Sequence, residues 1–197
     1  MGPYTPAQAL DALIDGNRRF ASGNPRYGHD IALAAAASGG QAPFAMVLGC
    51  IDSRVPLEAV FDQTFGCICV VRSGGHVLDE AVLGSVEFAV GELAVPLVMV
   101  LGHVRCGAVG ATVDALRSGR RPSASLGYLV DEIAPAVHEV GMDRDDVVDA
   151  ALRRHVGRTV ARLGQDALVR ERLDAGRLDL VGAVYDLDSG KVELLQP

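Results

Sequence analysis

Three short apolar runs alternate with helical patterns in the first half of the chain. The runs are FAMVLG (44–49), CICVVR (67–72) and PLVMVLG (96–102), and the segment between the last two, DEAVLGSVEFAVGEL, has helical periodicity. Nearly continuous apolar runs rich in β-branched residues are typical of parallel strands that are buried on both faces. The pattern predicts an α/β fold with a central, mainly parallel β-sheet flanked by helices.

The two ends of the chain predict additions to this sheet. Near the N-terminus, YTPAQALDALIDGNRRFASG reads as a helix with Thr5 as its cap, Pro6 at its first position and Gln8 completing a capping box. This N-terminal helical arm, residues 1–40, could lie on the core or reach across to another subunit. After a polar, helical middle, the DSG turn (188–190) between alternating runs predicts a C-terminal edge hairpin.

Composition limits the classes of protein that fit. The chain has 197 residues, of which 49% are hydrophobic, and we expect one domain, 1–197. A net charge of −7 without a basic block argues against a nucleic-acid partner. The start lacks the features of a secretion signal, and the longest apolar stretch, 93–101, is too short to span a membrane. We therefore expect a cytoplasmic protein with no membrane partner. In that compartment its cysteines (50, 67, 69 and 106) stay reduced.

Potential metal ligands follow two of the predicted strands. Cys50 comes directly after the first apolar run, and His103 comes directly after the third, with Cys106 three residues later. Ligands of open parallel sheets bind beyond the carboxyl ends of the strands, so these side chains converge if the two strands are neighbours. The alternative is two buried thiols and a core histidine. Two cysteines and one histidine leave a fourth position open, which is typical of a catalytic Zn²⁺ site with one ion per subunit.

The residues beside Cys50 are suited to a catalytic role. Asp52 is near enough in the chain to accept a hydrogen bond from a zinc-bound water, and Arg54 can form a charge-assisted pair with it. The plainer interpretation is a surface pair that contributes little to stability. Gly107, directly after Cys106, could offer its backbone N–H to substrate at a helix N-terminus.

These motifs resemble the β-class carbonic anhydrases. The resemblance is most specific over about residues 41–113, through CIDSRV, VVRSGGHV, GSVEFAVGEL and VPLVMVLGHVRCGAV, and it is weaker at VGAVYDLDSG. The family pattern is C-x-D-x-R followed by H-x-x-C, and its positions are occupied here by Cys50, Asp52, Arg54, His103 and Cys106.

The resemblance carries expectations about activity and assembly. It implies zinc on Cys50, His103 and Cys106, with Asp52 and Arg54 as the catalytic dyad. The implied reaction is the reversible hydration of carbon dioxide to bicarbonate and a proton by zinc-bound hydroxide. It also implies self-association as a dimer or tetramer, with the N-terminal helix packed on a partner subunit. Gln41 matches the family's glutamine that hydrogen-bonds substrate across the dimer interface.

The chain departs from the family pattern at several positions. Cys69 replaces a phenylalanine and Phe88 a tyrosine, and both positions line the apolar cleft for carbon dioxide in the family. Val47 replaces a tryptophan tied to a closed form in which the aspartate coordinates zinc, so we expect an open site without Asp52 on the metal. Cys67 and Cys69 would point to the same face of a strand, which leaves a second C-x-C metal site as an alternative to ordinary buried thiols.

Two rival functions and a few residues stay open. The first rival is a carbonyl sulfide or carbon disulfide hydrolase on the same scaffold, and the second is a non-catalytic, zinc-stabilised binding module with a fourth protein ligand. We interpret His76 as a structural or exposed residue and Arg72 as part of a buried structural pair. His29, His138 and His155 have polar neighbours in the sequence, and one of them could shuttle protons.

Overall fold

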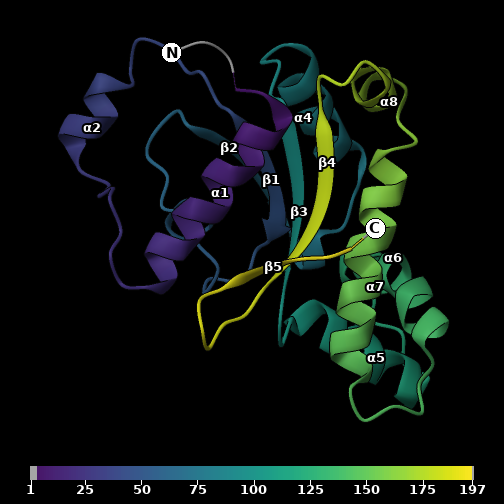
Figure 1. Cartoon of the computed structure of the whole chain (residues 1–197). Helices are drawn as coiled ribbons and strands as arrows, with labels where there is room; N and C mark the ends of the chain where they lie inside the picture. The colour runs from purple at the N-terminus through teal and green to yellow at the C-terminus, as the bar shows by residue number, and fades with distance from the viewer. Residues whose placement is uncertain (1–3, 197) are drawn as a thin grey trace.

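The computed structural model describes residues 4–196 and contains a five-stranded sheet in the order β2-β1-β3-β4-β5 (Figure 1). The strands are β1 (Ala45–Cys50), β2 (Ile68–Ser73), β3 (Leu97–His103), β4 (Asp179–Tyr185) and β5 (Val192–Leu194). Residues 1–3 and 197, the ends of the predicted domain, lie outside the described residues. Residues 1–3 also begin the N-terminal segment that lacks the features of a secretion signal.

The strand pairing confirms the predicted fold class. β2, β1, β3 and β4 are parallel, and β5 runs antiparallel to β4 as the edge strand of the C-terminal hairpin. β1 and β3 are hydrogen-bonded neighbours, with Met46 opposite Val98 and Gly49 opposite Leu101. Their carboxyl ends therefore reach the same edge of the sheet.

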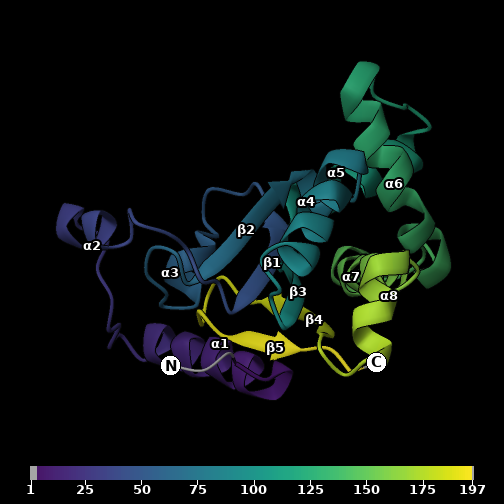
Figure 2. The ribbon, with the colours of Figure 1, turned by 90° about the horizontal axis from the view of Figure 1, so that it is seen from above.

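Helices cover both faces of the sheet. They are α1 (Pro6–Ala21), α2 (Ile31–Ala36), α3 (Leu57–Val60), α4 (Glu80–Gly91), α5 (Gly107–Ser118), α6 (Ala124–Val140), α7 (Val147–Leu163) and α8 (Ala167–Asp174), with a 3₁₀ turn, η1 (Gly74–His76). α1 lies on one face, and α4, with α7 and α8, covers the other (Figure 2). Every residue of β1 and β3 is buried, which explains their continuous apolar character. None of the described helices is long and apolar enough to cross a membrane.

The N-terminal arm divides into two parts. The capping box of α1 is present as predicted, with Thr5 accepting from the Gln8 backbone and Gln8 from that of Thr5. Ala9 and Leu13 are fully buried in the core that α1 shares with β1 and β3 of its own chain. α2, in contrast, has no buried residue. The structure therefore places α1 on its own core, while contact of the arm with a partner subunit stays a prediction.

A third part of the core lies at the carboxyl edge of the sheet. There α5, α6 and α7 pack together around the ends of β1 and β4. Cys50 and Cys106 belong to this apolar cluster, together with Val109 and Ile133. The loops that follow β1 and β3 are thus held on a packed base.

Candidate metal centre

Three buried side chains converge at the carboxyl edge of the sheet. Cys50 ends β1, His103 ends β3, and Cys106 is the N-cap residue of α5. Their ligand atoms all lie within 4.8 Å of one another, and the two sulfurs are 4.0 Å apart. A tetrahedral ion with zinc–sulfur bonds of about 2.3 Å would hold two sulfurs about 3.8 Å apart. The spacing fits zinc without large movement.

Local backbone conformation brings Cys106 back toward His103. Gly102 lies where a Cβ would be 2.7 Å from a Val156 methyl group, so a larger residue would push β3 away from α7. Arg105 has a positive φ of 55°, which reverses the chain between the end of β3 and the start of α5. The short H-x-x-C segment therefore places both of its ligand residues at one point.

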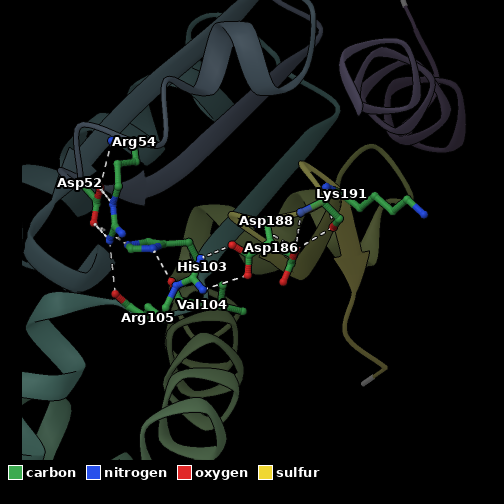
Figure 3. Close-up of polar contacts among 9 residues, drawn as sticks. Asp52, Arg54, His103, Val104, Arg105, Asp186, Asp188 and Lys191 are labelled. Atoms are coloured by element: carbon green, nitrogen blue, oxygen red, sulfur yellow. Dashed lines mark hydrogen bonds and ion pairs between the residues drawn. The ribbon is translucent and has the colours of Figure 1, made fainter. Parts of the chain in front are cut away.

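The orientation of His103 leaves one nitrogen free for a cation. Its Nδ1 lies 3.0 Å from the Val104 carbonyl oxygen, which can only accept, so Nδ1 carries the hydrogen (Figure 3). Nε2 is buried and has no hydrogen-bond partner among residues 4–196. A buried nitrogen lone pair without a partner is costly, and metal-bound histidines commonly use the other nitrogen in this way. The donor set fits a zinc ion.

The two thiols share one hydrogen bond. The hydrogen bond with Cys106, together with smaller contributions from His103 and the backbone of Asp52 and Gly75, lowers the pKa of Cys50 to about 4 despite burial. The same hydrogen bond and burial raise the pKa of Cys106. Cys50 is therefore the thiolate of the pair, and a divalent cation would stabilise the second negative charge as well.

Asp52 and Arg54 form a two-point ion pair above this cluster. Arg54 donates from Nε to Oδ1 at 2.9 Å and from Nη2 to Oδ2 at 2.7 Å (Figure 3). This contact holds the pKa of Asp52 well below its usual range, so the carboxylate stays ionised. Asp52 Oδ2 lies 3.8 Å from His103 Nε2, beside the cluster.

Comparison with known proteins agrees with this geometry. The family model described as "Carbonic anhydrase" matches residues 45–192. "Carbonic anhydrase 2" of Mycobacterium tuberculosis is 43% identical over 191 residues, covering 96% of this chain and 92% of its own. "Carbonic anhydrase" of Mycolicibacterium smegmatis is 44% identical and covers 96% and 93%. The chain belongs to the β-class carbonic anhydrases, a family of enzymes.

Solved structures of the family share the fold. A chain from the crystal structures of two tetrameric β-carbonic anhydrases of Sordaria macrospora aligns with a TM-score of 0.75 at 22% identity, covering 96% of this chain and 95% of its own. The β-carbonic anhydrase of Coccomyxa in complex with acetazolamide aligns with a TM-score of 0.73 at 24% identity, covering 94% and 86%. The resemblance, the fold and the enzyme class predicted from the sequence are confirmed.

Two arginines near the site have roles that the sequence did not reveal. Arg72 was expected in a buried structural pair, but it is exposed and donates to the carbonyl oxygens of Cys50 at 2.8 Å and Asp52 at 2.5 Å. The prediction was wrong because Arg72 lies opposite Gly49 in the ladder, where loop carbonyls are its nearest acceptors. Arg105 pairs at two points with Asp188 of the DSG turn, which attaches the hairpin to the site (Figure 3).

The residues predicted to bind substrate lie in different places. Gly107 is the first residue of α5, with no atom within 4 Å of where its Cβ would be. Cys69 is partly buried against the core on the α4 face, and Phe88 of α4 is 55% exposed. Gln41 is exposed beside Gly66 and precedes β1, whereas Cys50 ends it. β1 alone spans about 17 Å, so Gln41 is remote from the cluster of its own chain.

Two further interpretations of cysteines and histidines are corrected. Cys67 precedes β2 and packs on the α1 face of the sheet, whereas Cys69 packs on the opposite face. The premise of a C-x-C site, a shared face, is therefore wrong. His155 was assigned to polar surroundings but is only 4% exposed, on the inner side of α7. His76 is fully buried, which agrees with its structural interpretation.

Proposed function

We propose that this enzyme catalyses the reversible hydration of carbon dioxide to bicarbonate and a proton, with one zinc ion held by Cys50, His103 and Cys106. The observation that carries the proposal is the buried, partnerless Nε2 of His103 beside two sulfurs 4.0 Å apart. When bound, zinc supplies hydroxide near neutral pH by lowering the pKa of a water, to about 7 in carbonic anhydrases with three histidine ligands.

The side chains of this protein would orient the reactants. Asp52 is ionised and can accept a hydrogen bond from the attacking water. This bond would orient the lone pair of the water oxygen toward the substrate. Arg54 engages both carboxylate oxygens and so keeps Asp52 in place. The Gly107 N–H at the start of α5 is available to a substrate oxygen. Two thiolates donate more charge to zinc than histidines do, so we expect the pKa of a zinc-bound water to be higher here than with three histidines. Turnover should therefore rise toward alkaline pH.

The site is proposed to be open at neutral pH. Both oxygens of Asp52 are occupied by Arg54, so its coordination to the metal would require this ion pair to break. The described residues offer three ligand residues in the cluster rather than four, which disfavours a non-catalytic binding module. We also propose that the protein works in the cytoplasm, where its four free thiols persist.

We propose that a second copy of the chain completes the substrate pocket. Gln41 lies at the far end of β1 from Cys50, which supports its assignment to the site of a partner rather than to that of its own chain. Exposed apolar side chains, Ile51 next to Cys50 in the chain and Phe88 on α4, suit a covered interface. The tetrameric state of the Sordaria macrospora structures is a precedent for self-association. Cys69 and Phe88 would then line the cleft between subunits.

Stopped-flow hydration of carbon dioxide tests the proposed reaction. We expect the zinc-loaded wild type to be active and Asp52→Asn to lose about 100-fold or more of kcat/KM while retaining its zinc. Asp15→Asn, which removes an exposed carboxylate paired with Arg18 within α1, is the matched control and should stay near wild type. An unchanged rate in Asp52→Asn would remove this residue from the mechanism.

Cys69 has a small thiol where the family has an aromatic ring, and this difference favours considering a second class of substrate. A smaller side chain in the cleft could admit carbonyl sulfide or carbon disulfide. Measuring kcat/KM for carbonyl sulfide and for carbon dioxide on the same protein decides between the two functions. We expect carbon dioxide to be the better substrate, and Cys69→Phe to leave that preference in place.

A further inference from the structure

The turn η1 lies between the two loops that carry the candidate metal ligands. Ser73, the residue before it, is the ladder partner of Cys50 and accepts a hydrogen bond from the Ile51 N–H at 3.0 Å. On the other side, a Cβ at Gly75 would be 3.1 Å from the Cβ of Ala108 in the first turn of α5. Gly75 therefore packs between the end of β1 and the start of α5.

Gly75 is a flexible residue in a demanding position. Its φ is +62°, and a Cβ there would also be 2.9 Å from Ile133. The positive φ and these close contacts favour glycine here, but glycine has the widest conformational freedom of any residue. Some other contact must fix the orientation of its two peptide groups.

His155 of α7 makes this contact. Its Nε2 lies 3.0 Å from the Gly75 carbonyl oxygen, and because a carbonyl can only accept, Nε2 must carry the hydrogen. The ring lies against that of His76, with the centroids 4.5 Å apart. Nδ1 of His155 is buried and has no hydrogen-bond partner among the described residues. The bond from Nε2 to Gly75 is therefore the one hydrogen bond of this buried imidazole within the described part of the chain.

We propose that His155 is a positioning residue for the metal centre, which holds the Gly75 backbone between the end of β1, where Cys50 lies, and the start of α5, which follows Cys106. The proposal deepens the proposed function, since it takes Cys50 as a zinc ligand. Gly75 adjoins the segments of both sulfur ligands, since Ser73 is the ladder partner of Cys50 and Ala108 lies two residues after Cys106. Groups behind the metal ligands that fix their orientation tune the affinity for the metal.

Two substitutions distinguish the loss of the N–H donor at the Nε2 position from the loss of the imidazole ring itself. The amide nitrogen of glutamine reaches the position of Nε2, whereas that of asparagine stops at the position of Nδ1. We expect His155→Asn to weaken zinc binding about 10–100-fold, measured by competition with a chromophoric chelator. His155→Gln should bind zinc close to wild type. In the Co²⁺-substituted proteins, the sulfur-to-metal charge-transfer band should shift in His155→Asn and not in His155→Gln.

Thr159→Val is the matched control. Thr159 is buried one turn further along α7, and among the described residues its hydroxyl donates only to the backbone carbonyl of His155, so the change leaves the His155 side chain and its bond to Gly75 in place. It should keep the wild-type zinc affinity and charge-transfer band. Wild-type affinity in His155→Asn, or equal weakening in all three variants, would overturn the positioning role while leaving the proposed function intact. A wild-type protein that binds no zinc would instead overturn the proposed function, and this assignment with it.

Discussion

Burial keeps the His155 imidazole uncharged in the folded protein. Its pKa falls from 6.5 to about 4, chiefly because the protein interior disfavours the charged ring, and Arg158 adds to the effect. The pKa of the neighbouring His76 is also well below its ordinary value for the same reason. Because the folded pKa lies below the unfolded one, stability is fully present above pH 6.5 and is lost as the pH falls toward 4.

This shift predicts a pH-dependent loss of stability at the residue scale. A drop in pKa from 6.5 to about 4 corresponds to roughly 3 kcal/mol of folding free energy at low pH. Urea unfolding should show wild type losing more stability than His155→Gln between about pH 7 and about pH 4.5, because glutamine does not titrate. Parallel pH curves for the two proteins would contradict this origin.

Single residues differ in how far the sequence could predict them. Cys50 and His103 are predictable, since both end apolar strands whose parallel pairing brings them to one edge. His155 is not, because its partner is a backbone carbonyl 80 residues away and leaves no mark on the local pattern. The Arg105–Asp188 pair was equally hidden, although both residues lie beside motifs at the same edge.

At the scale of elements, Asp62 joins the N-terminal arm to the segment that follows α3. Its side chain is 1% exposed and accepts from Arg19 of α1 and from the backbone N–H groups of Arg26 and Tyr27. Burial raises the pKa of Asp62, but these hydrogen bonds lower it by more, so it lies below its usual value. The carboxylate thus favours the docked arm above the unfolded pKa of about 3.9, and the effect is lost as the pH falls.

Replacing this carboxylate should loosen the arm. Asp62→Asn turns an amide donor toward N–H groups that need an acceptor, and we expect it to lower the free energy of unfolding by roughly 3 kcal/mol. Asp15→Asn, which removes the exposed partner of Arg18, should cost less than about 0.5 kcal/mol. Urea denaturation of the three proteins measures both values. Similar losses in the two variants would show that Asp62 has no special role.

The elements themselves were largely predictable. β1 and β3 are buried on both faces, so their sequences contain almost no polar interruption. The position of α1 was not predictable, because one apolar stripe suits either the core of its own chain or that of another subunit. The structure places Ala9 and Leu13 in its own core through specific tertiary contacts that periodicity does not encode.

At the scale of the whole molecule, the proposed site needs two chains. In this proposal, Asp52 and the metal ligands belong to one chain and Gln41 to its partner. A mixture of Gln41→Ala and Asp52→Asn chains tests this division, because a mixed dimer contains one site with both native residues. Each variant alone should have low activity.

Co-expression of the two variants should restore activity. With random pairing, half of the dimers are mixed and each has one intact site, so about a quarter of wild-type turnover should return. Stopped-flow assays on the co-expressed and the singly expressed proteins provide the comparison. If Gln41 served its own chain, every site in the mixture would be defective, and no activity beyond the average of the two variants would appear.

The most direct measurement is the zinc content of protein purified under reducing, chelator-free conditions. The account predicts about one zinc per chain in the wild type and in Cys67→Ser and Cys69→Ser, and almost none in Cys50→Ser and Cys106→Ser. A wild type without zinc, or equal zinc contents in all four variants, would contradict the claim that two strand ends form a single metal site.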